Sequence, residues 1–147
     1  MSVYFYNEDV SLPSLNYDVL KNVLKNEIRR NGLRLGEINY IFCSDNYLLD
    51  LNIKFLNHNF YTDVITFDYS ENNRIAGDIY ISTERVLNNS VIFEQNYSNE
   101  LIRVISHGLL HLLRYNDKEL VEIELMRMKE SELMNKYFAS MPTLDKQ

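Results

Sequence analysis

Two histidines followed by an aspartate form the strongest chemical pattern in this sequence. His107 and His111 lie four positions apart, and Asp117 follows six residues after the second histidine. Four residues advance a helix by about 400°, so both imidazoles would project from one helical face, one turn apart. If the helix ends near Tyr115, the chain can turn back and bring Asp117 to the same ion. Two imidazoles and one carboxylate leave coordination positions open, which is typical of catalytic rather than structural zinc.

The segment that carries the histidines is apolar on nearly every other helical face. Its remaining residues between 101 and 113 are largely apolar, which is typical of a packed central helix. The polar residues form one stripe, within roughly 40° of a common line: Glu100, Arg103, His107, His111 and Arg114. Burying imidazoles and guanidinium groups without partners would be costly, so we expect this stripe to face a cleft with a ligand. A surface coincidence or a hydrogen-bonded core pair is the alternative for two histidines alone, and Asp117 favours the metal.

The residue types around the histidines discriminate between substrates. An ion with open positions can activate water or polarise a carbonyl or phosphoryl oxygen. Metallopeptidases of the His-Glu-x-x-His type place a general-base glutamate directly after the first histidine, where this sequence has Gly108. Arg103 and Arg114 flank the histidines, and guanidinium groups suit contacts to phosphate. The pattern favours phosphodiester over peptide chemistry, although both arginines could equally pair with carboxylates such as Glu100.

The composition fits one globular domain over residues 1–147. The chain has 147 residues, of which 46% are hydrophobic, enough for a real core. Its one cysteine, Cys43, excludes an internal disulfide and lies in an apolar run, as a small core residue would. The first residues lack the pattern of a secretory signal, and no apolar run approaches the roughly 20 residues of a membrane span. We therefore expect a cytoplasmic protein without membrane association.

The net charge restricts how the chain can bind nucleic acid. A formal charge of -6 gives no general attraction to a polyanion. Any such substrate would have to be held by a local basic patch.

Alternating apolar segments predict strands and helices in mixed order. We expect strands, rich in β-branched and aromatic residues, at 3–6, 37–43, 62–67 and 77–82. We expect helices at 14–30, 44–56, 82–89, 98–115 and 118–137. In the last of these, the apolar residues among the acidic ones are Val121, Leu125, Met128 and Leu133. The predicted fold class is α+β, with a small, mostly parallel or mixed four-stranded sheet and a central buried helix that carries the histidine pair.

Several linked motifs resemble the YbeY family of bacterial metal-dependent endoribonucleases. They run from about Leu51 to Asp117: Leu51-Asn52, Thr62-Asp63-Val64-Ile65-Thr66-Phe67, Gly77-Asp78-Ile79-Tyr80-Ile81-Ser82, and His107-Gly108-x-Leu110-His111-Leu112-Leu113 followed by Tyr115-x-Asp117. The resemblance implies a single α+β domain, one zinc ion and cleavage of single-stranded RNA. It also implies roles in maturing the 3′ end of small-subunit (16S) ribosomal RNA and in ribosome quality control, with the small ribosomal subunit as a partner.

Three positions depart from the pattern of that family. The usual third metal ligand is a histidine, and Asp117 stands at its position; carboxylate is also a sound zinc ligand. A glycine that usually ends the histidine helix is replaced by Arg114, so the turn must form without glycine's freedom at positive φ. An arginine usual before the Thr-Asp strand aligns with Leu56, so we consider Arg103, Arg114 and His58 as candidate catalytic residues in its place. A histidine such as His58 is, by itself, more often an ordinary loop residue.

We therefore hypothesise a zinc endoribonuclease. His107, His111 and Asp117 would hold the ion, and a zinc-bound water or the Lewis acidity of the ion would drive cleavage while arginines bind phosphate. Two alternatives stay open. One is a metallopeptidase-like hydrolase, because that group shares the His-x3-His-x5-Asp spacing; the other is a ribosome-assembly binding factor in which zinc is structural.

Overall fold

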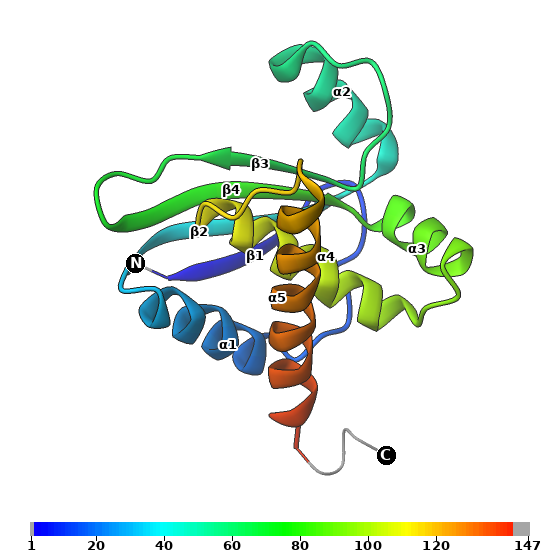
Figure 1. Ribbon diagram of the computed structural model, residues 1–147. Helices are drawn as coiled ribbons and strands as arrows, with labels where there is room; N and C mark the ends of the chain where they lie inside the picture. Colours follow the sequence, from blue (N-terminus) through cyan, green and yellow to red (C-terminus); the bar gives the residue numbers. More distant parts are fainter. Residues whose placement is uncertain (1, 143–147) are drawn as a thin grey trace.

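Four strands form one mixed sheet in the order β1-β2-β4-β3 (Figure 1). In the computed structural model, which describes residues 2–142, β1, β2 and β4 run parallel, and β3 pairs antiparallel with β4. The bounds of the strands are β1 Val3–Asn7, β2 Arg34–Cys43, β3 Val64–Asp68 and β4 Arg74–Ser82. The predicted α+β fold with a mixed sheet of four strands is confirmed.

Two strands, β2 and β4, begin three residues earlier than the sequence indicated. β4 begins at Arg74 because residues 70–73 form a tight reversal, in which Glu71 and Arg74 exchange backbone hydrogen bonds and Asn72 adopts a φ of 55°. Asparagine tolerates this left-handed conformation better than most residues. Because β2 lies beside β4, its own first residues are paired as well, and Arg34 is in register with Arg74.

Helices cover both faces of the sheet. Along β4, Ile79 and Ile81 pack into the main core, whereas Tyr80 packs into a second cluster with residues of α2. Successive side chains of a strand point to opposite faces, so α2 covers one face while α1, α4 and α5 cover the other. The bounds of the helices are α1 Tyr17–Arg30, α2 Asp45–Leu56, α3 Thr83–Ile92, α4 Tyr97–Leu112 and α5 Leu120–Ala139. Within residues 2–142, no helix is both long and apolar enough to cross a membrane.

The central helix is α4, which lies between the sheet and α5 (Figure 1). The hydroxyl group of buried Tyr40 on β2 donates a hydrogen bond of 2.9 Å to the carbonyl oxygen of Ile105 in α4. Gly108 allows a close approach to β4, because a Cβ atom there would lie 2.8 Å from Cγ2 of Ile79. Position 108 therefore faces the sheet, and a glutamate there would have no room. The expectation of a buried central helix that carries the histidine pair is confirmed.

The buried face of α5 differs from the one expected. Val121, Leu125 and Met128 are exposed, and of the four apolar residues named from the sequence only Leu133 is buried. The buried residues instead follow the spacing 4, 3, 4 along the helix: Met126, Glu130, Leu133 and Tyr137. The buried face of α5 was predicted wrongly because one of its residues, Glu130, is charged and was not counted as buried.

Candidate metal centre

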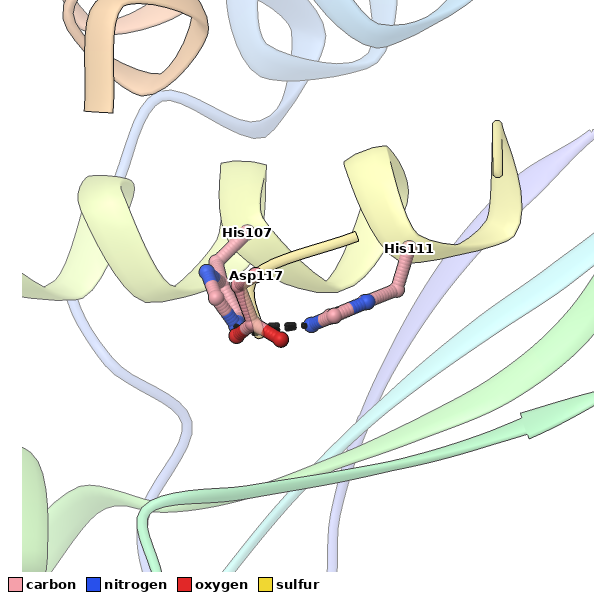
Figure 2. Close-up of side chains that lie close together, drawn as sticks. All are labelled: His107, His111 and Asp117. Carbon is pink, nitrogen blue, oxygen red and sulfur yellow. Dashed lines mark hydrogen bonds and ion pairs between the residues drawn. The ribbon is translucent and has the colours of Figure 1, made fainter. Parts of the chain in front are cut away.

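All three predicted ligands converge on one point beneath the C-terminal half of α4 (Figure 2). The Nε2 atoms of His107 and His111 lie 2.9 Å apart, and Oδ2 of Asp117 lies 3.4 Å from each of them. Ligand atoms about 2.0–2.1 Å from a tetrahedral zinc ion are separated from one another by roughly 3.3 Å. The three separations, 2.9 to 3.4 Å, lie close to the spacing that such an ion requires, and the donor set fits a divalent metal.

A buried carboxylate on α5 sets the orientation of His107. Nδ1 of His107 lies 2.6 Å from Oε2 of Glu130, whose side chain is 3% exposed. With Nδ1–H donating to this carboxylate, the lone pair of Nε2 is left free for a metal. Sequence reasoning missed Glu130; the signal for it is an acidic residue at helical spacing from Met126 and Leu133.

Arg103 lies behind His107 rather than in front of the ligands. Its Nη1 lies 3.3 Å from Oε1 of Glu130, and two further hydrogen bonds, of 2.9 and 2.6 Å, join it to the carboxylate of Glu100. These hydrogen bonds, above all those to Glu100, raise the pKa of Arg103 and keep its charge fixed. Arg103 therefore pairs with carboxylates, as the alternative interpretation of the sequence expected. A role of Arg103 in binding phosphate stays a prediction.

The environment of His111 favours the neutral imidazole that a metal needs. Burial and the neighbouring His107 lower the pKa of His111, against a smaller opposite effect of Asp117 and of a hydrogen bond to the backbone of Tyr115. A lowered pKa means that protons leave this side chain more readily at neutral pH. A metal ion would then compete with few protons for Nε2.

The turn at the end of α4 brings Asp117 back to the histidines. The helix ends at Leu112 rather than near Tyr115, and Arg114 itself adopts the left-handed conformation, with a φ of 74°. Two backbone hydrogen bonds of 3.0 Å close the turn, from Arg114 N–H to the His111 carbonyl and from Tyr115 N–H to the Leu110 carbonyl. This is the Schellman arrangement, in which glycine usually holds the position of Arg114.

The three ligands border a cavity of about 560 Å³ between α4, β3 and the segment that follows α2. Its other lining residues are Asn52, Leu56, His58, Phe60, Thr62, Asp63, Val64, Ile65, Thr66 and Asp68. His58 and Leu56, two of the positions singled out from the sequence, thus line the cavity. Burial raises the pKa of Asp63, partly offset by Arg103 and His107.

The two predicted arginines differ in their relation to this cavity. Arg114 is 72% exposed, and its Nη1 lies 3.2 Å from Oδ2 of Asp68, which lines the cavity. Arg103 instead lines a separate cavity together with Arg127 and Glu130. The structure places Arg114 and His58 near the three ligands, and it places Arg103 behind them.

Comparisons with known proteins agree with the resemblance seen in the motifs. A family profile described as Endoribonuclease YbeY matches residues 6–138. Proteins named Endoribonuclease YbeY are 42% identical over 131 residues in Parabacteroides distasonis (89% of this chain, 92% of the relative) and 44% identical over 131 residues in Amoebophilus asiaticus (88% and 89%). A Thermotoga maritima protein solved in solution superposes with a TM-score of 0.66 at 25% identity, covering 93% of this chain and 89% of its own.

The backbone at Arg114 gives a stability prediction. A left-handed conformation costs a non-glycine residue about 1 kcal/mol, so Arg114→Gly should raise the free energy of unfolding by about that amount. Arg114→Ala is the matched control, because it removes the same side chain and keeps the unfavourable φ. Urea denaturation of both variants measures the difference, and equal stability of the Gly and Ala variants would contradict this account of the turn.

The contact of Glu130 with His107 gives a prediction about metal affinity. Glu130→Gln replaces the carboxylate that accepts the hydrogen bond from Nδ1–H of His107 by a weaker acceptor, so the affinity for zinc should fall by about 10–100-fold. Competition with a chelator of known affinity measures the change. Glu132→Gln is the control, since this glutamate lies on the same helix, is partly exposed and pairs with Lys129. Equal affinity of the Glu130→Gln variant and the wild type would show that Glu130 does not orient the ligand.

Proposed function

This chain belongs to the YbeY family of endoribonucleases, and from that premise we propose a zinc-dependent enzyme that cleaves single-stranded RNA. Its catalytic unit is a single YbeY-like metallohydrolase domain. The observation that carries the proposal is the convergence of His107, His111 and Asp117, through three donor atoms 2.9 to 3.4 Å apart, at the edge of an open cavity.

The positions of the donor atoms support a role for each ligand. His107 and His111 would hold one zinc ion through Nε2, and Asp117 would hold it through Oδ2. When bound, zinc supplies Lewis acidity toward a phosphoryl oxygen and lowers the pKa of water. Glu130 keeps His107 in the tautomer that binds metal, and the neutral form of His111 adds a second lone pair.

The positions of the residues near the ligands support two candidate contacts to substrate. Arg114 and His58 lie where they can contact a phosphodiester, at the rim and at the wall of the cavity. Arg103 acts through Glu130, because its guanidinium group donates hydrogen bonds to the carboxylates of Glu100 and Glu130. We regard Arg103 as a positioning residue, so the phosphate contacts fall to Arg114 and His58.

Family membership supports the biological substrate. The proposed target is the 3′ end of small-subunit (16S) ribosomal RNA, in its maturation and in ribosome quality control. The small ribosomal subunit is then the partner, and the cytoplasm is the compartment.

The geometry supports catalysis over the two alternatives. Three protein ligands beside a cavity fit a catalytic zinc ion, which would keep a position for water or substrate, whereas structural zinc has four protein ligands. The metallopeptidase mechanism needs a glutamate after the first histidine, and position 108 is packed against Ile79. An assembly role on the ribosome is compatible with the nuclease activity.

The proposal predicts that metal retention and RNA cleavage are lost together. His111→Ala removes one of the two imidazole ligands, so zinc should be absent after purification without a histidine tag. Cleavage of single-stranded RNA should fall at least 100-fold, which corresponds to a loss of ~3 kcal/mol of transition-state stabilisation. Metal content by mass spectrometry and an RNA digest measure the two effects. The control is wild-type protein stripped by a chelator and then reloaded with zinc, which should lose and regain activity. Cleavage that persists after verified removal of metal would refute the mechanism.

A further inference from the structure

We propose that His58 and Phe60 form a stacking platform for unpaired RNA bases beside the metal centre. The inference rests on the proposed function and names how that same cavity recognises its substrate. In this account most of the binding energy comes from the bases, and contacts between phosphates and cations contribute little.

The two rings are already arranged as a stack. Their centroids lie 5.2 Å apart, and their planes differ by 21°. Both residues line the cavity that contains His107, His111 and Asp117, and Phe60 is 56% exposed. An exposed aromatic face next to a nuclease centre is suited to a nucleobase, because every base offers a flat π surface.

The platform is held in place by a buried amide. Asn52, only 2% exposed, donates from its side chain to the carbonyl oxygen of Phe60 at 2.9 Å. The backbone carbonyl oxygen of Asn52 accepts a hydrogen bond of 3.1 Å from the N–H of His58. Asn57, with a φ of 56°, makes the turn out of α2 that allows both contacts. A loop fixed in this way loses little entropy when a base stacks on it.

The charges around the cavity favour bases over phosphates as the source of affinity. Among the described residues that line it, Asp63, Asp68 and Asp117 are acidic, and neither lysine nor arginine occurs. Arg114 at the rim is paired with Asp68. Apart from the proposed zinc ion and the candidate contacts of Arg114 and His58, a phosphodiester backbone would meet no lysine or arginine among the described residues that line the cavity, on a chain with a formal charge of -6. The position of Leu56 in the same wall adds apolar surface rather than charge.

The platform predicts which nucleic acids bind. A base can stack on Phe60 only if its face is not covered by neighbours in a duplex, so the ligand must be single-stranded. Purines should bind more tightly than pyrimidines because their rings are larger. Binding should also depend weakly on salt, with a log–log slope no steeper than about -1.4, equivalent to roughly two phosphate contacts.

The test compares two exposed phenylalanines. We would measure by fluorescence anisotropy how zinc-loaded protein binds a 2′-O-methyl oligoadenylate decamer, and a gel of the recovered decamer would verify that it stays intact. Phe60→Ala should raise Kd about tenfold, as expected for one lost stacking contact. Phe60→Tyr should stay within about twofold of the wild type, because it keeps the ring. Phe93→Ala, at the end of α3 and outside this cavity, is the matched control and should leave Kd unchanged.

The outcomes separate this inference from the proposed function. Equal Kd values for the wild type and the Phe60→Ala variant, with normal cleavage of single-stranded RNA, would overturn the platform and leave the nuclease standing. Equal binding of an abasic decamer would also overturn it. A wild-type protein that neither binds the decamer nor cleaves RNA would refute both proposals. Zinc affinity and the unfolding midpoint of the Phe60→Ala variant should match those of the wild type, since Phe60 is exposed.

Discussion

The reversal of the chain after α4 is the constraint on which the metal centre depends. A helix can place two histidines on one face, but its axis then runs on past the ion, so here the third ligand comes from the segment after the helix. The left-handed residue Arg114 turns the chain, and Asp117 returns to within 3.4 Å of both imidazoles. A straight continuation of the helix would carry Asp117 away and leave a weak two-ligand site.

Contacts on both sides of α4 then support this arrangement. Gly108 lets α4 lie close to Ile79 of the sheet, and Tyr40 bonds to the backbone of α4 from β2. On the other side, Glu130 of α5 holds His107 in one tautomer and is itself bonded to Arg103. Among the three ligands, His107 is therefore oriented by a buried residue of the core.

Local patterns predicted most of the fold and the ligand set, because spacing along one chain segment determines them. The histidine pair, the four strands and the caps at Ser44 and Ser82 are features of this kind. Glu130 was missed because its partner lies 23 residues away, in a packing contact that no single segment encodes. For Arg103 the local partner Glu100 could be named from the sequence, but the second carboxylate, Glu130 on α5, could not.

Zinc X-ray absorption spectroscopy on the purified protein tests the central claim most directly, because it reports the ligands of the ion itself. The account predicts one zinc ion per chain, bound by two imidazole nitrogens and by oxygen ligands, at about 2.0–2.2 Å. A spectrum with a sulfur ligand, or with fewer than two imidazoles, would contradict the metal centre described above.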